Sequence, residues 1–352
     1  MTDRDITAEL TERIRQADAD RPLRIHGGDS KRFFGRQVEG DPLPLSAHRG
    51  IVSYDPAELV LTARAGTPLA EVETYLAANS QRLPFEPPHF SPHATLGGAV
   101  ASGLSGPARV WAGSVTDHLL GVRMIGSRAR PLRFGGEVMK NVAGYDVARL
   151  MAGSLGTLGV LTEVSVRVQP AAVGQCTIVI DRNQGEALET LGSSALARLP
   201  ASATCWVDGR LYLRLEGAPA TLNQLKERLG GQVVSEAKDL WLSVREQTHD
   251  FFVRRSPLWR LILPPTAPVL SLESAPLIEW NGMQRWYADE SPAELRQAAA
   301  KHGGFATLFK GTTPDDEVFA PLSAPLMRAH RALKQAFDPK GIFNPGRMYQ
   351  DL

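Results

Sequence analysis

The stretch from residue 158 to residue 168 alternates apolar with mostly polar positions, which predicts one half-buried strand, and Pro170 ends it. A short helix is expected before it, over residues 146–151, and the loop between the two carries Gly153, Gly156 and Gly159. Glycines let a backbone approach a bulky partner closely and present N–H groups to it. The pattern therefore indicates either a simple turn or a loop that holds a phosphate or a nucleotide ring.

Near the N-terminus, Ile6, Leu10 and Ile14 lie on one face of an expected helix, and residues 23–25 form a short expected strand. The loop HGGDSK at 26–31 follows this strand directly. Two glycines, small polar residues and a lysine offer what a pyrophosphate needs: close backbone approach, N–H donors, a hydroxyl and a cation. The loop is not a Walker A motif, and no G-x-G-x-x-G follows a strand, so a nicotinamide-binding Rossmann domain loses its main support.

Residues 95–107, TLGGAVASGLSGP, are nearly all small. They either leave room for a large flat group against the backbone or form a tightly packed helix of small residues. A strand is predicted over 115–124. His89 and His93 are four positions apart, but Pro92 disfavours a continuous helix there and no acidic third ligand is evident, so no metal site is expected.

Beyond Pro170, strand and helix patterns follow each other in a β-α-β-β-α-β order. The expected strands are 176–180, 204–207, 211–215 and 232–234, and the expected helices are 186–199 and 221–229. A second round follows, with strand 259–263, a hairpin across Asn281-Gly282, helix 292–302 and strand 305–309, before a last helix over 324–337. The expected fold class is α+β, with antiparallel sheets covered by helices on one face.

The 352-residue chain is 43% hydrophobic and 22% charged, which is typical of a globular protein with room for two domains. Its net charge of +1 gives no electrostatic case for nucleic acid or an anionic membrane. Cys176 and Cys205 stand alone, so neither a disulfide framework nor a cysteine metal site is indicated. No secretory leader and no run of about 18 uncharged apolar residues occurs, so we expect a cytoplasmic location, with contact to the inner face of the membrane only through partners.

Four motifs resemble, in order and spacing, the FAD-binding oxidoreductases of the vanillyl-alcohol oxidase and p-cresol methylhydroxylase (PCMH) type. They are HGGDSK at 26–31, TLGGAVASGLSG at 95–106, KNVAGYDVARLMAGSLGTLGVLTE at 140–163 and DPKGIFNPGR at 338–347. The match covers residues 24–168 and roughly the last fifteen residues. Within this group, FGGEVMKNVAGYD, LRLEG and NPGRM make the chain similar to the smaller FAD-binding subunits of bacterial glycolate oxidases (glycolate dehydrogenases).

This resemblance implies a PCMH-type FAD-binding domain of two subdomains over 1–170, a cap domain that would meet the substrate over 171–323, and a C-terminal segment over 324–352 that returns to the FAD. It places the pyrophosphate at Gly27, Gly28, Asp29, Ser30 and Lys31, and the flavin and ribityl chain at Thr95, Gly97, Gly98, Ser102 and Gly103. Gly159 and Val160 would meet the adenosine end, Asn344 and Arg347 would return to the flavin, and Gly144 and Tyr145 are further candidates. The phosphate loop carries no cysteine, and its one histidine, His26, comes just before the glycines, so we expect FAD to be non-covalently bound.

Two departures from the family matter. Asp29 stands where the family usually has glycine, so Lys31 or another cation must offset its repulsion of the phosphates, unless Asp29 points away. The H-x-x-G-D-G-N-x-H run with which the larger hydroxy-acid oxidases assemble their active site is absent, and no catalytic residue is assigned. The nearest feature is His302-Gly303-Gly304-Phe305.

The resemblance implies an FAD-binding subunit of a multi-subunit oxidase that converts glycolate, and D-lactate as a second substrate, to the 2-oxo acid. Its expected partners are a larger FAD-linked oxidase subunit and an iron–sulfur subunit. Two alternatives stay open: a self-sufficient FAD-linked 2-hydroxy-acid dehydrogenase, and a structural subunit that only keeps a flavin fold. In the cap, Arg214, Arg260 and Arg285 with Trp259, Trp280 and Trp286 either line a substrate site or are ordinary sheet residues. Trp241, Phe251, Phe252 and Trp259 are candidates for a partner surface, with core packing favoured for most of them.

Overall fold

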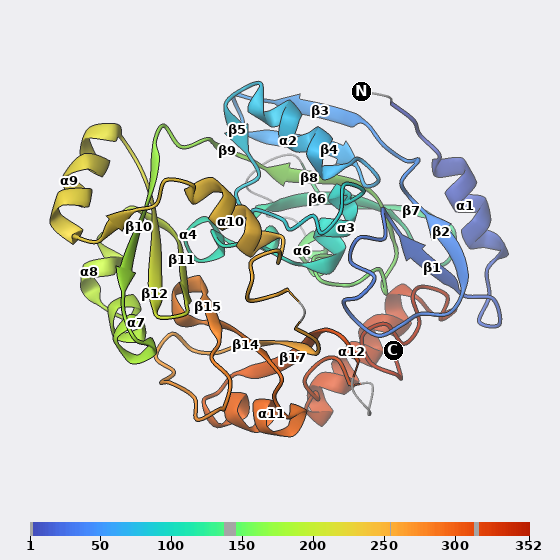
Figure 1. Ribbon diagram of the computed structural model, residues 1–352. Coiled ribbons are helices and arrows are strands. Elements are labelled where there is room, and N and C mark those ends of the chain that lie inside the picture. Colours follow the sequence, from blue (N-terminus) through green and yellow to red (C-terminus); the bar gives the residue numbers. More distant parts are fainter. Residues whose placement is uncertain (1–2, 137–145, 254, 313–316) are drawn as a thin grey trace. The chain divides into compact units, whose positions relative to one another are not determined.

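The computed structural model describes residues 3–136, 146–253, 255–312 and 317–352 (Figure 1). The chain divides into two compact units. The first unit consists of Met1–Ser105, Ser114–Ala171 and Pro321–Leu352, and the second of Gly106–Gly113 and Ala172–Ala320. The last part of the chain therefore folds with the first part.

A five-stranded antiparallel sheet is the centre of the first unit (Figure 1). Its order is β3 (Ile51–Asp55), β4 (Val60–Arg64), β8 (Val160–Arg167), β6 (Leu119–Ile125) and β7 (Pro131–Gly135). The alternation predicted a half-buried strand at β8, but both of its faces are largely buried. The reason is that the second face is also used: Leu161 lines the pocket described below, and the Ser165 hydroxyl lies 2.8 Å from that of Thr62.

The strand predicted over 115–124 begins later than expected. Its first residues form a helical turn, α5 (Val115–His118), and β6 starts at Leu119. Ser114 and Asp117 explain the difference, because they form a capping box in which the Ser114 N–H donates to the Asp117 carboxylate at 2.8 Å. The sequence contains this box, but the apolar positions around it hide it.

Shorter elements complete the first unit. α1 (Thr7–Gln16) buries Leu10 and Ile14 as predicted. β1 (Leu23–His26) pairs in parallel with β2 (Asp41–Pro44), and β5 (Gln81–Arg82) pairs with β9 (Gln169–Pro170). The helices α2 (Leu69–Ala77), α3 (Leu96–Ser102), α6 (Val147–Leu150) and α12 (Ala324–Phe337) pack around the sheet.

A buried ion pair joins the end of α12 to the segment after it. The Lys334 ammonium donates to Asp338 Oδ2 and to the carbonyls of Thr157 and Phe343, each at 2.8 Å. The Asp338 carboxylate accepts the N–H groups of Ile342 at 3.1 Å and Phe343 at 2.8 Å. All polar groups of the pair thus have partners, which fixes the course of the chain toward residues 344–347.

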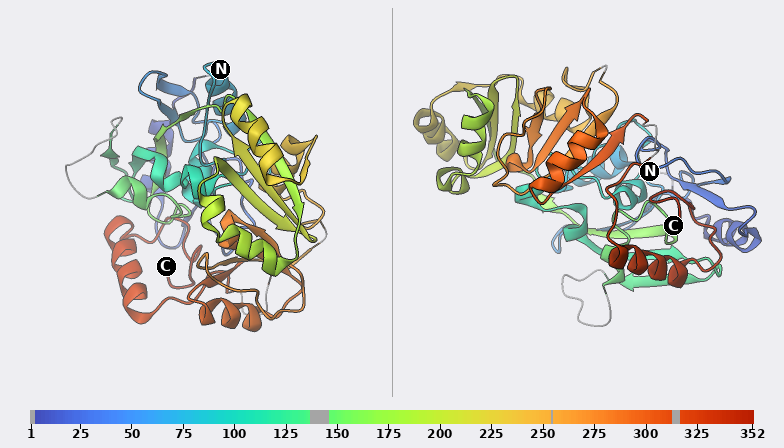
Figure 2. Two further views of the ribbon diagram at one scale, coloured as in Figure 1. Left: turned by 90° about the vertical axis from the view of Figure 1, so that its left-hand side faces the viewer. Right: turned by 90° about the horizontal axis from the view of Figure 1, so that it is seen from below.

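An eight-stranded antiparallel sheet forms the second unit (Figure 2). Its order is β13 (Gln232–Val233), β10 (Gln175–Asp181), β12 (Arg210–Glu216), β11 (Ala201–Val207), β15 (Leu277–Glu279), β16 (Gln284–Ala288), β14 (Leu258–Ile262) and β17 (Phe305–Lys310). The β10-α7-β11-β12-α9-β13 succession confirms the predicted β-α-β-β-α-β order. Figure 2 shows α7 (Gln184–Leu191), α9 (Pro219–Leu229) and α11 (Pro292–Lys301) on one side of the sheet.

Two details of the second unit differ from expectation. The helix predicted over 186–199 is interrupted, because Ser193 is extended and its hydroxyl caps a separate helix, α8 (Ser194–Ala197). A helix that was not predicted, α10 (Ala237–Arg245), lies on the sheet face opposite α7 and α9, where the Trp241 indole N–H donates to Thr177 Oγ1 at 2.8 Å. The residues offered both as a partner surface and as core, Trp241, Phe251, Phe252 and Trp259, are all buried in this unit.

Candidate functional site

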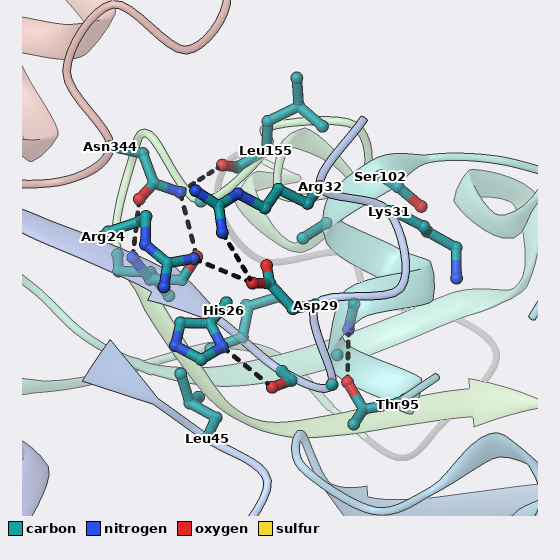
Figure 3. Close-up of a pocket in the computed structure, with 18 of the residues that line it drawn as sticks. Arg24, His26, Asp29, Lys31, Arg32, Leu45, Thr95, Ser102, Leu155 and Asn344 are labelled. Carbon is teal, nitrogen blue, oxygen red and sulfur yellow. Dashed lines mark hydrogen bonds and ion pairs between the residues drawn. The ribbon is translucent and has the colours of Figure 1, made fainter. Parts of the chain in front are cut away.

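Four segments of the first unit supply most of the residues that line a pocket (Figure 3). They are the loop after β1, the first turns of α3, the glycine loop before β8 and the C-terminal segment. The lining residues are 24–32, Gln37, Val38, Leu45, Ala65, Thr95, Gly97, Gly98, Ala101, Ser102, Leu155, Gly156, Gly159, Leu161, Asn344 and Arg347. Segments far apart in the sequence thus converge on one site.

The glycines of the first loop allow two chain segments to cross closely. A Cβ on Gly28 would lie 1.6 Å from the carbonyl oxygen of His93, and one on Gly27 would lie 2.2 Å from Thr95 Oγ1. No side chain fits at either position. The loop therefore presents its backbone to the pocket, as the pyrophosphate interpretation requires.

Gly98 has a different reason to lack a side chain. A Cβ there would meet only Thr95 Oγ1, at 3.1 Å, so the protein itself leaves the space beside Gly98 empty. Thr95 is the N-cap of α3, and its hydroxyl accepts the Gly98 N–H at 3.2 Å. Gly97, by contrast, packs against Ala65: a Cβ added to Gly97 would lie 2.6 Å from the Ala65 Cβ. The small residues of α3 thus serve both tight packing and the pocket wall.

Two C-terminal side chains hold the pocket loops in place. Asn344 Oδ1 accepts the Ile25 N–H at 2.7 Å, and its Nδ2 donates to the Leu155 carbonyl at 2.7 Å. The Arg347 guanidinium donates to the carbonyls of Arg36 at 2.6 Å and Phe34 at 2.6 Å. Both side chains line the pocket, but these hydrogen bonds go to the backbone of its walls. Figure 3 shows those of Asn344.

Asp29 is paired within the pocket wall. Its φ of +57° is left-handed, and its Oδ2 lies 3.1 Å from Arg24 Nη1 and 3.9 Å from Arg32 Nη1 (Figure 3). Lys31 points away from Asp29, and its ammonium lies 3.3 Å from Ser30 Oγ and 3.4 Å from the His89 carbonyl. The cation that offsets Asp29 is therefore Arg24, with Arg32 farther away.

Burial changes the electrostatics of two pocket residues. It lowers the pKa of Arg347 to about 10, an effect that Asp29 opposes and that Arg32 and Arg24 increase. Arg347 still carries its charge near neutral pH. Burial also lowers the pKa of His26, against the opposing effect of Asp29, so that the ring is neutral at pH 7. The pocket wall is cationic overall.

Most residues expected at the cofactor line this pocket: Gly27, Gly28, Asp29, Ser30, Lys31, Thr95, Gly97, Gly98, Ser102, Gly159, Asn344 and Arg347. Gly103 ends α3 with a φ of +66° and packs on Gly153, and Val160 begins β8 in the core, so neither is among the lining residues. Gly144 and Tyr145 lie outside the described residues. Three further lining residues, Arg24, Arg32 and Gly156, were not assigned to the cofactor from the sequence. The first two flank the HGGDSK loop closely, and Gly156 belongs to the glycine loop already considered for a phosphate or a nucleotide ring.

In the second unit, the three arginines considered for substrate all contact other groups of the protein. Arg285 is fully buried and donates to the carbonyls of Gly282, Pro268 and Ala267. Arg214 bonds Ser202 Oγ at 2.8 Å and stacks on Trp241. The Arg260 guanidinium lies over the Phe309 ring, 5.4 Å from its centre. Burial lowers the pKa of Arg260 to about 10, and the nearby positive charge of Arg109 contributes to this lowering. Ordinary structural roles therefore account for Arg285 and Arg214.

Two features are absent from the part of the chain that the structure describes. No group of three His, Cys, Asp or Glu side chains there is arranged to hold a metal ion. His89 Nε2 instead lies 3.1 Å from Glu73 Oε1. None of the helices in the described ranges is long and apolar enough to cross a membrane.

Comparisons with known proteins identify the family. A family model described as an FAD binding domain matches residues 6–135, and one described as the C-terminal domain of FAD linked oxidases matches residues 283–348. The chain is 48% identical over 352 residues to the glycolate oxidase subunit GlcE of Escherichia coli (strain K12), covering 99% of each chain. The chain belongs to the GlcE family of FAD-linked oxidase subunits. This confirms the family resemblance carried by the four motifs.

The chain is also similar to more distant relatives and to a solved structure. The chain is 23% identical to the glycolate oxidase subunit GlcD of Bacillus subtilis (strain 168), over 89% of this chain and 80% of that protein. It is 29% identical to a D-lactate dehydrogenase of Anaerostipes hadrus, over 40% of this chain and 29% of that protein. An alkyldihydroxyacetonephosphate synthase structure shares the fold, with a TM-score of 0.64 at 14% identity, over 97% of this chain and 74% of that chain. The α+β fold class is confirmed.

Proposed function

We propose that the pocket of the first unit binds FAD non-covalently and that the chain works as one subunit of a glycolate oxidase. The observation that carries this proposal is the empty space beside Gly98, in a pocket whose walls come mainly from four separate segments. A pocket with several backbone-presenting loops suits a dinucleotide better than a mononucleotide. The pyrophosphate would lie against residues 27–31 and the flavin against Thr95, Gly97, Gly98 and Ser102.

The remaining site residues have supporting roles in this proposal. Gly159, Gly103 and Val160 belong to the segments that would meet the ribityl chain and the adenosine end, and Gly144 and Tyr145 stay predictions of the resemblance. Asn344 and Arg347 would act by holding the loops against the cofactor. We propose that the first unit is the FAD-binding domain, including the C-terminal segment, and that the second unit is the cap.

FAD, when bound, supplies the acceptor for the hydride that leaves the α-carbon of a 2-hydroxy acid. This chain's own contribution in the first unit is to bind and orient. Fast oxidation also needs a base for the hydroxyl and a cation for the carboxylate. The H-x-x-G-D-G-N-x-H run is absent, and Arg214 and Arg285 already have structural partners. We therefore propose that a larger, GlcD-like FAD-linked subunit supplies these groups.

The complex would oxidise glycolate, and D-lactate as a second substrate, and pass the electrons to an iron–sulfur subunit. Support for a partner of this kind comes from the relative named as a subunit, at 48% identity over nearly the whole chain. We propose a cytoplasmic location, at the inner face of the cytoplasmic membrane through the complex. Neither nucleic acid nor direct membrane binding is part of the proposal.

The test is to express the chain singly, record its visible spectrum, and follow anaerobic bleaching on adding glycolate or D-lactate. We expect bound FAD that neither substrate bleaches at a useful rate. Adding the larger subunit and the iron–sulfur subunit should restore turnover, since a positioned general base is commonly worth about 10²–10⁴-fold. Rapid bleaching by the single chain would favour the self-sufficient dehydrogenase. A colourless chain that takes up no FAD would favour the structural subunit.

A further inference from the structure

Asp29 is the acidic residue among those that line the pocket. Its carboxylate lies between two guanidinium groups (Figure 3). Its Oδ2 is 3.1 Å from Arg24 Nη1 and 3.9 Å from Arg32 Nη1. The Arg24 and Asp29 side chains are 21% and 34% exposed, so the pair is partly screened from water. This geometry is that of an anion held at a cationic site.

The other two lining cations, Arg347 and Lys31, lie within hydrogen-bond distance of neutral groups. Arg347 donates to backbone carbonyls, and the Lys31 ammonium lies near Ser30 Oγ and the His89 carbonyl. Arg24 and Arg32 differ because each forms an ion pair with the Asp29 carboxylate, at 3.1 Å and 3.9 Å. The cations that line this wall outnumber its one lining carboxylate, so the wall keeps enough positive charge to attract a diphosphate while Asp29 is present.

We propose that Asp29 is a built-in competitor for the cofactor's phosphates: it occupies Arg24 and Arg32 in the free chain, and the diphosphate takes these arginines from it on binding. This proposal rests on the proposed FAD site. Guanidinium groups form strong, often bidentate pairs with phosphate, so the exchange is favourable for the arginines. Asp29 is a third exposed and can be rehydrated when it is displaced.

Two consequences follow from an exchange of partners. First, the carboxylate weakens FAD binding, because it must be displaced and it then remains near two phosphates. Secondly, salt affects FAD binding only weakly, because each arginine exchanges one anion for another instead of gaining one. Removing the carboxylate should therefore tighten FAD binding and make it more sensitive to salt.

The experiment compares the wild-type chain with Asp29→Asn, after removal of bound flavin, in titrations with FAD, ADP and riboflavin at low and high salt. Coulomb's law at a partly exposed site gives about three- to tenfold tighter FAD and ADP binding for Asp29→Asn. Riboflavin, which has no phosphate, should bind equally to both proteins. Asp41→Asn is the matched control, because it removes one carboxylate from an exposed ion pair with Arg21 that is not part of the pocket wall.

Arg24→Gln tests the other half of the exchange. It should weaken FAD binding, and Asp29→Asn added to it should give a smaller gain than in the wild type. Asp29→Gly serves as a second variant if Asp29→Asn is poorly folded, because glycine suits the left-handed φ of +57°.

The outcomes separate the two proposals. Wild-type binding of FAD with equal or weaker binding by both Asp29 variants would overturn the exchange and leave the FAD site intact. An equal gain for riboflavin would also overturn it, since the effect would then not involve phosphate. If neither the wild-type chain nor any of its variants binds FAD, the FAD site and the exchange are both overturned.

Discussion

Asn344 Oδ1 accepts the backbone N–H of Ile25 at 2.7 Å, although the two residues are 319 positions apart. The same side chain donates to the Leu155 carbonyl. Asn344→Ala would leave these backbone groups without their partner, which costs about 1–3 kcal/mol of unfolding free energy. We expect lower thermal stability and weaker FAD binding together, measured by thermal unfolding and flavin titration.

Asn223→Ala is the control for Asn344→Ala. Asn223 is exposed and accepts from Lys226 at 3.2 Å. Its loss should change the unfolding free energy by no more than about 0.5 kcal/mol and leave FAD binding unchanged. Equal effects of the two substitutions would show that Asn344 does not hold the pocket.

Gly98 and Gly28 should respond differently to an added side chain. Gly98→Val should leave the chain folded but colourless, because its methyl groups would occupy space that the protein leaves empty. Gly28→Ala should destabilise the fold itself, because its Cβ would meet the His93 carbonyl oxygen at 1.6 Å. Flavin content and thermal unfolding of both variants check this. A folded and fully yellow Gly98→Val protein would remove Gly98 from the site.

Lys334 and Asp338 should behave as a buried ion pair. Lys334→Met would leave Asp338, whose side chain is 0% exposed, without its cation, and breaking such a pair costs about 3–5 kcal/mol. Arg331→Met on the same helix removes the exposed pair with Asp351 and should cost about 0–1 kcal/mol. Denaturant unfolding of the two variants gives the comparison. Similar costs for both would mean that Lys334 is effectively solvated.

His48 should make the first unit less stable in mild acid. Burial lowers the pKa of His48 below its usual 6.5, against the opposing effect of Asp5, and Nδ1 accepts the Ile6 N–H at 3.1 Å. The unfolded chain therefore takes up the proton more readily. The contribution of neutral His48 to the free energy of unfolding is fully present above about pH 6.5. It is lost as the pH falls through the lower pKa that His48 has in the folded state.

Thermal unfolding between about pH 7.5 and pH 5.5 measures this effect of His48. His48→Asn keeps an acceptor for Ile6 and cannot be protonated, so its melting temperature should fall less over this range. His330→Asn, at an exposed position of α12, should behave as the wild type does. If the melting temperature of His48→Asn fell with pH as steeply as that of the wild type, the acid sensitivity would belong to another group.

The flavin should be released completely by acid precipitation. No cysteine occurs among the described residues that line the pocket, and the His26 Nδ1 lies 3.2 Å from the Gly27 carbonyl. We therefore expect all yellow colour in the supernatant. Colour retained in a washed pellet of the wild type but lost from a His26→Ala pellet would instead show a covalent bond to His26.

Much of this structure could be predicted from patterns within single segments. The strands of the second unit alternate clearly, and Asp208-Gly209 marks its hairpin, with positive φ at both residues. The capping box of Ser114 and the interruption at Ser193 were missed because apolar periodicity dominated the local polar residues. The partner of Asp29 was missed for another reason: Lys31 is nearer in sequence, and only the left-handed turn at Asp29 directs its carboxylate to Arg24.

The Arg347 guanidinium bonds to the backbone of residues 34 and 36, and this has a consequence for protein synthesis. The pocket loop is synthesised first, and Arg347 follows Arg36 by 311 positions. Translation must therefore pass Asn344 and Arg347 before their side chains can hold the pocket loops. A chain truncated before Asn344 would lack the contacts of both side chains.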